Sequence, residues 1–540
     1  MTNAIVAPEP LAVEEGAKVL MAGGNAIDAA VTAAAVQAVI DPQMCGVGGY
    51  AVFTLHLANP DPQTGQQRIS IDAPALAGSK VTPDMWVDKY IRPNPDGWGY
   101  FLEGSVNELG YTSVCTAGWV KAMSTLLDRW GTYSWAQVVE PAARIAEEGF
   151  VVNERLMNMW QRVKRYPESC ALLDYIIGNP ESRRIYLRED GKPYEMGQMI
   201  SNPDYAKTLR HLGEHGPEDF YHGELADRMA ADLAANGSFV TRDDFTNYAL
   251  REDMLVSGTY RGYTVTNTSA PHGGPTMIAI LNILEGFDLA AMGHNSPDYI
   301  YTLGMAMKAA FADRNRFMAD PEFNDVPIEW MMSKERAAEW QAHIRAEKEI
   351  TADYAANGHP DTTQVTVVDN AGNCISLTHS LGVSSGAITP GMGFMYNNSM
   401  INFYPLPGHP NSIEPGKGRT TGMAPTIVYK DDKPIIVLGS PGASRIITSN
   451  LQVVLNVLDF GMSISDAVHA PRIDCQLNDI RCHARIPEFV CAEVRKKHPI
   501  SRIPQSHGGF ALVQAITIDP ETGVLAGAAD TGTDGMALVV

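Results

Sequence analysis

The sequence HPDTTQVTVVDNAGNCISLTHS, residues 359–380, contains a β-hairpin pattern that begins just after two adjacent threonines. Residues 364–369 and 374–379 are rich in strand formers, and residues 370–373 between them are turn formers. The pattern predicts two antiparallel strands, with Thr362 directly before the first. Threonine is common in strands, so this position alone fits a structural role as well as a chemical one.

A threonine at the start of a strand becomes a nucleophile if the chain is cut before it. Breaking the Asp361–Thr362 bond would give Thr362 a free α-amine, whose unperturbed pKa is about 8. This amine can accept the proton of the threonine hydroxyl at neutral pH. The β-methyl group restricts χ1 and so helps to aim the hydroxyl. One residue would then supply both the nucleophile and the base.

A glycine-rich turn later in the chain offers groups that could stabilise negative charge. Residues 438–445 read LGSPGASR, between a predicted strand at 434–438 and a predicted helix at 446–458. Backbone N–H groups at a helix start point toward an anion. Such a turn is a candidate oxyanion hole for attack on an amide.

The order of predicted elements favours an α+β fold. Asn25 is placed to cap a buried apolar helix over residues 26–40, and residues 50–56 and 68–72 look like paired strands. Residues 114–350 are mostly helical in pattern, and strand patterns return after residue 361. Alternating blocks of strands and helices predict layers of each, rather than a doubly wound parallel sheet.

Composition excludes several classes of protein. The 540 residues carry a net charge of −21, which argues against nucleic acid or an anionic membrane as partner. No apolar run is long enough to span a bilayer, and the start MTNAIVAPEP lacks the features of a signal peptide, so we expect a cytoplasmic protein. Seven scattered cysteines without a CxxC pair indicate reduced thiols rather than disulfides or a zinc site.

Segments along nearly the whole chain resemble the γ-glutamyltransferases, a family of self-processing N-terminal-nucleophile (Ntn) hydrolases. The matching segments, in chain order, are GGNAIDAAV (23–31), GVGG (46–49), residues 141–152, FYHGELADRMA (220–230), APHGGPT (270–276), ADRNRFMADPEF (312–323), TTQVTVVDNAGNCISLT (362–378), MAPTIV (423–428), GSPGASRIIT (439–448) and APRID (470–474).

The resemblance implies a four-layer αββα sandwich and a precursor that cuts itself between Asp361 and Thr362. Residues 1–361 would form the large subunit and residues 362–540 the small one, giving an αβ heterodimer that could pair into a dimer of heterodimers. Thr362 would form an acyl-enzyme that water or an acceptor amine releases. No cofactor and no metal are implied.

The resemblance also assigns supporting roles at the site. Thr378 or Ser380 would lie near the amine of Thr362, and Gly442 with Ala443 would supply the oxyanion N–H groups. Relatives usually have glycine at position 443. Alanine keeps the backbone donor, and we expect it to be tolerated provided that its φ is negative.

The sequence departs from the family where relatives hold a glutamyl group. Pro74, in SIDAPALAG (70–78), stands where an arginine is expected to bind the substrate carboxylate. Five further positions have also lost the family's residues, namely Gly382, Ser399, Asn402 and the adjacent Thr421 and Gly422. A desolvated carboxylate and ammonium need charged or multiply hydrogen-bonding partners. We therefore expect a small-molecule amide substrate other than a γ-glutamyl compound, of the oxamate or acylase type.

Two alternatives remain open: a γ-glutamyl enzyme with a rebuilt pocket, and an unprocessed relative that only binds. The segment 403–422 is shorter than in many relatives, which would admit water and favour hydrolysis. His379, His272 and Arg445 could each bind a carboxylate of the substrate, or could simply be packed structural residues.

Two other patterns compete weakly with Thr362. Residues 382–386 (GVSSG) match the GxSxG serine elbow, but no helix is predicted after them. His211 and His215 have the spacing of metal ligands on a helix, yet nearby glycines weaken that helix. We expect neither to be a site.

Overall fold

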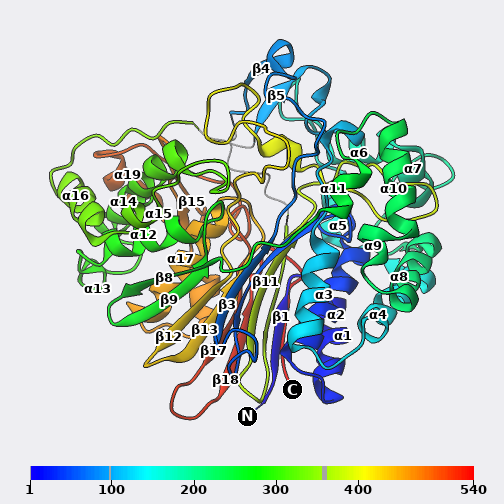
Figure 1. Ribbon diagram of the computed structural model, residues 1–540. Helices are drawn as coiled ribbons and strands as arrows, with labels where there is room; N and C mark the ends of the chain where they lie inside the picture. Colours follow the sequence, from blue (N-terminus) through cyan, green and yellow to red (C-terminus); the bar gives the residue numbers. More distant parts are fainter. Residues whose placement is uncertain (1, 96–98, 355–361) are drawn as a thin grey trace.

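Two six-stranded antiparallel sheets form the centre of the molecule (Figure 1). The computed structural model describes residues 2–95, 99–354 and 362–540. The first sheet has the order β19 (Met536–Val539), β1 (Ala4–Ala7), β10 (Thr363–Val368), β11 (Cys374–Ser380), β2 (Tyr50–His56) and β3 (Arg68–Ala73). The second has the order β18 (Leu525–Ala529), β17 (Gln514–Ile518), β13 (Lys433–Gly439), β12 (Thr426–Lys430), β9 (Tyr263–Thr268) and β8 (Leu255–Tyr260).

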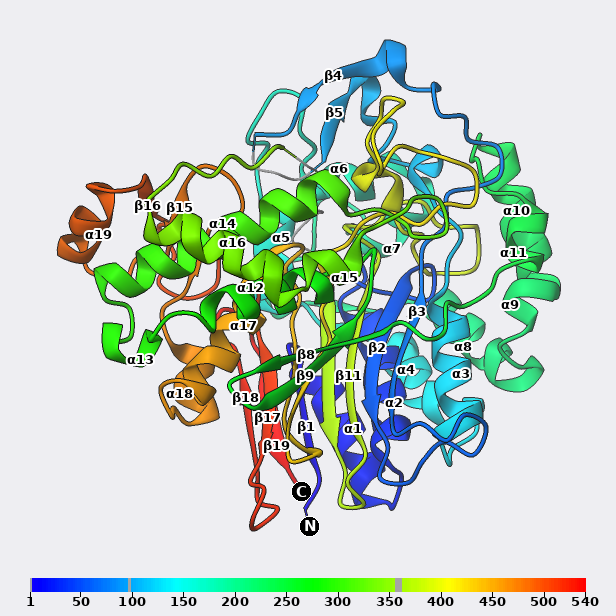
Figure 2. The ribbon, with the colours of Figure 1, turned by 60° about the vertical axis from the view of Figure 1, so that its left-hand side comes forward.

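Helices cover the outer face of each sheet, and Figures 1 and 2 show both helical layers. The helices α1 (Pro10–Met21), α2 (Ala26–Ile40) and α3 (Trp119–Trp130) contact the first sheet, while α4 (Trp135–Glu148) packs on α2 and α8 (Pro203–His215) packs on α4. The helices α12 (Gly274–Leu284), α17 (Arg445–Leu458) and α18 (Ile464–His469) contact the second sheet, while α14 (Pro297–Phe317) and α16 (Lys334–Arg345) pack on α12. The fold is therefore the predicted four-layer αββα sandwich.

Further helices and strands surround these layers. They are α5 (Glu154–Trp160), α6 (Leu172–Gly178), α7 (Pro180–Tyr186), α9 (Asp219–His222), α10 (Glu224–Ala235), α11 (Arg242–Thr246), α13 (Leu289–Met292), α15 (Ile328–Met331), α19 (Glu488–Arg495), β4 (Tyr90–Pro93), β5 (Tyr100–Leu102), β6 (Phe150–Val151), β7 (Met199–Ile200), β14 (Ile473–Asp474), β15 (Ile480–Cys482) and β16 (Ile500–Arg502).

Local sequence signals explain the elements that hold the site. Asn25 and Asp28 form a reciprocal capping box at the start of α2, as the sequence predicts, and this helix is buried on nearly all sides. The predicted hairpin is β10–β11, and the predicted pair of strands before it is β2–β3. Within the two large sheets, the strands β1, β8, β9 and β19 were not predicted.

The register of β10 and β11 decides which side chains face the second sheet. Gln364 pairs with Thr378, and Thr363 pairs with His379. Because side chains alternate along a strand, these two pairs point to opposite faces. Ser376, on the same face as Thr378, donates a hydrogen bond to the carbonyl of Leu438 in β13. The Thr378 face therefore lies between the sheets, and the His379 face lies against helices.

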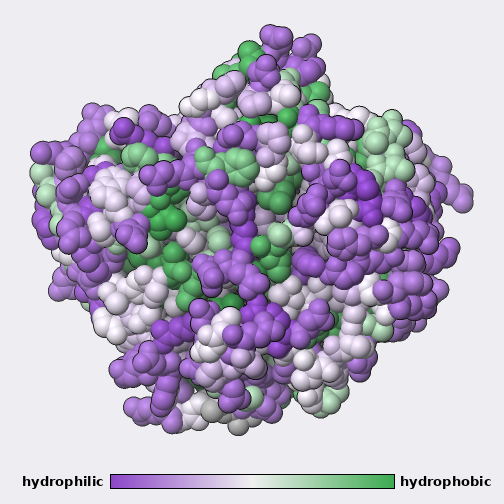
Figure 3. Space-filling view, in the orientation of Figure 1, coloured by the Kyte–Doolittle hydropathy of each residue, from purple (hydrophilic) through white to green (hydrophobic). Residues whose placement is uncertain are grey.

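The outer surface shown in Figure 3 is mostly hydrophilic, and hydrophobic residues gather in limited areas near its centre. None of the described helices combines the length and the apolar character needed to cross a bilayer.

Candidate active site

Thr362 lies directly before β10 and is 4% exposed. Thr362 is two residues before Gln364. Because side chains alternate along a strand, both side chains belong to the face between the sheets. Its proposed cleavage partner, Asp361, lies outside the described residues. The buried start of a central strand gives the Thr362 hydroxyl a fixed direction.

Ser380 is the hydroxyl neighbour of Thr362. The hydroxyl of Thr362 donates to Ser380 Oγ at 3.3 Å, and the N–H of Gly382 donates to the same Oγ at 2.9 Å. Thr378 lies one pair further along the hairpin, where its hydroxyl donates to Gln364 Oε1 at 2.6 Å. Of the two residues that the resemblance places near Thr362, the structure brings Ser380 into contact with its hydroxyl.

The turn between β13 and α17 has an unusual backbone. Gly442 has a φ of +143° and Ala443 a φ of +54°. The condition of a negative φ, under which we expected alanine to be tolerated at position 443, is therefore not met, because the turn enters α17 through the left-handed region. Neither the N–H of Gly442 nor that of Ala443 donates a hydrogen bond within the described part of the chain. Two adjacent N–H groups thus remain available at the start of a helix of 14 residues.

A cavity of about 800 Å³ is lined by both Thr362 and Gly442. Its wall also includes the arginines Arg155, Arg162, Arg165, Arg445 and Arg481, against the acidic residues Glu154 and Asp534. This excess of positive charge contrasts with the net charge of −21 for the whole chain. A cleft lined by charges of one sign concentrates ligands of the opposite sign.

Arg445, a candidate from the sequence, belongs to this cavity wall. Its Nη1 donates to the carbonyl of Gly509 at 2.9 Å, and its Nε lies 4.0 Å from Asp474. The guanidinium is thus held in place at the start of α17, beside the turn that contains Gly442.

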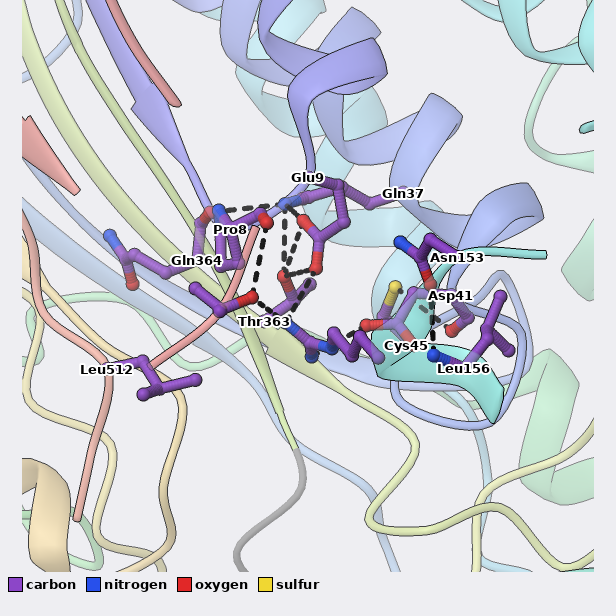
Figure 4. Close-up of polar contacts among 12 residues, drawn as sticks. Pro8, Glu9, Gln37, Asp41, Cys45, Asn153, Leu156, Thr363, Gln364 and Leu512 are labelled. Atoms are coloured by element: carbon purple, nitrogen blue, oxygen red, sulfur yellow. Dashed lines mark hydrogen bonds and ion pairs between the residues drawn. The ribbon is translucent and has the colours of Figure 1, made fainter. Parts of the chain in front are cut away.

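A buried acidic cluster lies on the helix side of the same strand end (Figure 4). The hydroxyl of Thr363 donates to Glu9, whose carboxyl oxygens are both 3.2 Å away, and Gln37 donates to Glu9 as well. Arg155 lies 3.3 Å from Glu9 and 2.8 Å from Asp41. Burial raises the pKa of Glu9 to about 8, the charge of Asp41 adds to the rise, and Arg155 opposes it. Glu9 is therefore largely protonated at neutral pH.

This cluster connects to the cavity through Arg155, which lines the wall near Thr362. Sequence reasoning missed Glu9 and Arg155. Neither belongs to a motif, since Glu9 follows a strand of only four residues and Arg155 lies in a helix of seven.

His379 is not part of the site. Trp119 donates its indole N–H to His379 Nδ1 at 3.1 Å, and His379 Nε2 lies 2.8 Å from Gln37 Oε1. Burial lowers the pKa of His379 to about 3, so the ring is neutral. Its side chain points toward α2 and α3, away from Thr362, because it alternates with Thr378 and Ser380.

Three candidate residues of the acyl pocket are buried near the site. Gly382 has a φ of +76°, and a Cβ atom there would lie 2.3 Å from Asn398. Ser399 and Asn402 are 0% and 2% exposed, and their Oγ and Oδ1 atoms have no hydrogen-bond partner in the described part of the chain. Buried polar atoms without partners indicate room for water or a ligand.

Thr421 and Gly422 have mainly structural contacts. The hydroxyl of Thr421 lies 2.7 Å from His272 Nδ1, and His272 Nε2 lies 3.0 Å from Asp72. A Cβ atom on Gly422 would lie 2.2 Å from the carbonyl oxygen of Ala443, so this glycine permits close packing against the turn that contains Gly442 and Ala443. His272 is thus held between Asp72 and Thr421.

A cation does lie beside the segment that contains Pro74, although sequence reasoning missed it. Leu76 pairs with Gly418 in an antiparallel bridge, and Arg419 follows directly. The guanidinium of Arg419 is 4.6 Å from the centre of the Tyr50 ring and forms a hydrogen bond with the Tyr50 hydroxyl. An arginine within the glycine-rich GKGRTTG (416–422) was the available sequence signal.

The competing patterns lead to no site. His211 hydrogen-bonds Asp219 at 3.0 Å and stacks on His215. Among the described residues, no group of three or more metal-ligating side chains is placed to hold an ion. The segment 382–386 is followed by turns and not by a helix.

A buried threonine at the start of a central strand, in an αββα sandwich and beside two free N–H groups, defines the class of Ntn hydrolases. The family model described as gamma-glutamyltranspeptidase matches residues 12–540. The chain belongs to this family, and it is an enzyme of the hydrolase or acyltransferase type that acts on amide bonds.

Individual relatives agree with this assignment. The chain is 36% identical to the acylase ACY 1 proenzyme of Pseudomonas sp. (strain V22), over 99% of this chain and 93% of the relative. It is 33% identical to the glutathione hydrolase proenzyme of Escherichia coli (strain K12), over 87% of this chain and 80% of the relative. The crystal structure of cephalosporin acylase from Bacillus halodurans superposes with a TM-score of 0.86 at 27% identity, covering 99% of this chain and 95% of the other.

Proposed function

We propose that the chain cleaves itself before Thr362 and then hydrolyses an amide through an acyl-enzyme on the Thr362 hydroxyl. The observation that carries this proposal is the position of Thr362 in the cavity wall together with Gly442, with its hydroxyl 3.3 Å from Ser380 Oγ. Nucleophile, hydroxyl neighbour and N–H donors come from three separate segments. The proenzyme names of the two relatives support self-cleavage.

Self-cleavage would be a shift of the Asp361 acyl group from the nitrogen to the hydroxyl oxygen of Thr362, followed by hydrolysis of the ester. The Thr362 oxygen attacks the carbonyl carbon of Asp361, the C–N bond breaks, and the nitrogen takes the hydroxyl proton. The resulting ester is hydrolysed by water, which leaves the carboxylate of Asp361 and the α-amine of Thr362. The two products, residues 1–361 and 362–540, would stay together, because each large sheet contains strands from both. Pairing of two such heterodimers stays a prediction.

Catalysis would then use the new amine as base. The amine takes the hydroxyl proton while the oxygen attacks the substrate carbonyl, and the N–H groups of Gly442 and Ala443 stabilise the oxyanion. When the C–N bond of the substrate breaks, the protonated amine of Thr362 gives this proton to the leaving nitrogen. Water attacks the acyl ester in the same manner and frees the acid.

The substrate is proposed to be an amide other than a γ-glutamyl compound. Pro74 provides no charge for a glutamyl carboxylate, and the similarity to two acylases supports an acylase-type substrate. The cavity lined by arginines supports an anionic compound.

Intact mass under denaturing conditions tests the proposal. We expect two fragments that meet at Asp361/Thr362 for the wild-type chain and for Thr362→Ser, which keeps a hydroxyl. Thr362→Ala should remain one uncut chain. A wild-type chain that stays uncut, or a Thr362→Ala chain that is cut at the same place, would contradict the proposal. The processed enzyme is then screened for release of aniline from acyl anilides.

A further inference from the structure

In the proposed mature enzyme, Thr362 is the first residue of its subunit, so its only covalent connection to the fold is Thr363. Thr363 begins β10, and its pairing with His379 is the last backbone pair at this end of the β10–β11 hairpin. A misplacement of about 1 Å near reacting atoms can cost about 100-fold in rate. The direction of the Thr362 hydroxyl therefore depends on how firmly Thr363 is held.

The side chain of Thr363 is fully buried on the helix side of the sheet, where two residues from different segments hold it (Figure 4). Its hydroxyl donates to the carboxyl group of Glu9, whose oxygens are both 3.2 Å away. It accepts a hydrogen bond from Nε2 of Gln37 at 3.0 Å. Glu9 directly precedes α1 and Gln37 lies in α2, so these contacts join the start of β10 to two helices that pack on the first sheet.

The direction of these hydrogen bonds is set from behind. The indole N–H of Trp119 can only donate, so the neutral ring of His379 accepts at Nδ1 and carries its hydrogen on Nε2. His379 Nε2 therefore donates to Gln37 Oε1 at 2.8 Å. This contact turns the amide so that Gln37 Nε2 faces Thr363 and Glu9. Because Gln37 presents only a donor there, the hydroxyl hydrogen of Thr363 is directed to Glu9.

Glu9 shares its surroundings with a second carboxyl group. The described titratable or charged groups that face it are Asp41 and Cys45, which follow α2, and Arg155 on α5. Burial raises the pKa of the Cys45 thiol, so the thiol is uncharged. Among the described residues, one guanidinium thus lies 3.3 Å from Glu9 and 2.8 Å from Asp41. One charge cannot balance two buried carboxylates, and burial, which raises the pKa of Glu9 to about 8, places the remaining proton there.

We propose that protonated Glu9 is a positioning residue, which holds Thr363 and thereby fixes the direction of the Thr362 hydroxyl. This inference rests on the proposed function, because Thr362 is the nucleophile that Glu9 orients. Glu9 does not line the cavity that contains Thr362, so it acts through Thr363 and not on the substrate. When Glu9 loses its proton, it and Asp41 repel each other, and the carboxyl group moves away from Thr363.

Kinetics of variants at both ends of the contact test this role. Glu9→Ala removes the carboxyl group, and Thr363→Val removes the hydroxyl that it holds. We expect each to lower kcat for an acyl anilide by about 100-fold, with KM within about 2-fold of wild type. The double variant should be no slower than either single variant, because both changes remove the same contact. Glu9→Gln keeps an acceptor oxygen and should keep the kcat of wild type at pH 7.

The pH profile separates positioning from a merely structural role. The kcat of wild type should decrease above about pH 8, where Glu9 loses its proton, whereas Glu9→Gln cannot ionise and should stay level. Glu14→Gln, an exposed change on α1, is the matched control and should keep the wild-type decline. A Glu9→Ala variant that loses stability in urea but keeps the kcat of wild type, or a Glu9→Gln variant with the alkaline decline, would overturn the inference.

A measurement without substrate separates failure of this inference from failure of the proposed function. Threonine methyl groups are isotope-labelled for NMR, and the Thr362 signal is assigned by its loss in Thr362→Ser. Its order parameter should fall in Glu9→Ala and Thr363→Val and remain unchanged in Glu9→Gln. This result in a protein that hydrolyses no anilide would support the positioning role and contradict the proposed function. An order parameter that Glu9→Ala leaves unchanged would refute the inference, whether or not wild type hydrolyses amides.

Discussion

The hydroxyl of Thr362 lies 3.3 Å from the hydroxyl oxygen of Ser380, a residue 18 positions later in the chain. The β10–β11 hairpin produces this contact, because its register brings the start of one strand beside the end of the other. Ser380 is itself oriented by the N–H of Gly382 at 2.9 Å. A backbone donor thus orients the hydroxyl that contacts Thr362, the proposed nucleophile.

Removing the Ser380 hydroxyl should slow both self-cleavage before Thr362 and amide hydrolysis by Thr362. We expect Ser380→Ala to reduce the rate of self-cleavage and kcat by about 10- to 100-fold, since a hydrogen bond that positions the reacting oxygen is lost. A time course of intact mass measures the first rate. The matched control is Ser257→Ala on the exposed edge strand β8, which should behave as wild type. Equal rates for both variants would show that Ser380 has no positioning role.

Gly442 should not tolerate a side chain. Its φ is +143°, and a Cβ atom would lie 2.5 Å from the Cβ of Ala511. Gly442→Ala must therefore move the turn, so we expect loss of catalysis and a free energy of unfolding lower by about 2 kcal/mol. Urea denaturation measures the free energy of unfolding, and hydrolysis of an anilide measures catalysis. A variant with wild-type kcat would exclude this N–H from the oxyanion hole.

Ala443→Gly should stabilise the protein. Ala443 has a φ of +54°, and a residue with a Cβ atom in the left-handed region carries a cost of about 1 kcal/mol that glycine avoids. The N–H donor remains, so activity should persist. Ala338→Gly, on the exposed face of α16, is the control, because alanine there has ordinary helical geometry. Its free energy of unfolding should fall by about 1 kcal/mol. Equal losses in the two variants, measured by urea denaturation, would contradict the strained turn.

Glu9 should make stability decrease as the pH rises. Its pKa is raised to about 8 in the folded protein, against an ordinary value of about 4.5. Between these values the folded state holds a proton that the unfolded state has released, so the free energy of unfolding falls by up to about 1.4 kcal/mol per pH unit. Glu9→Gln should flatten the decline between about pH 5 and pH 8.

Denaturation at several pH values measures this slope. Glu14→Gln, an exposed change on helix α1, which begins directly after Glu9, is the control and should keep the wild-type slope. An unchanged slope in Glu9→Gln would mean that Glu9 is ionised in the folded protein.

Local patterns in the sequence were sufficient for the elements with strong periodicity. The turn residues at 370–373 and the strand formers around them predicted β10 and β11 to within a residue, and Asn25 predicted the start of α2. The strands β1 and β19 are four residues each and lie near opposite ends of the chain. They were not predicted, because each is stabilised by pairing with distant strands and not by local sequence.

Periodicity and turn chemistry in the sequence predicted an α+β fold and the β10–β11 hairpin, because these are local properties of the chain. The order of the motifs along the chain, through the resemblance to γ-glutamyltransferases, predicted the four-layer sandwich and the candidate nucleophile. Tertiary structure alone decided which side chains reach Thr362. Strand alternation turns His379 toward helices and Ser380 toward the site, the path into α17 gives Ala443 a positive φ, and pairing of Leu76 with Gly418 brings Arg419 to Tyr50. These outcomes depend on register and on contacts between distant segments, and those form only when the layers pack.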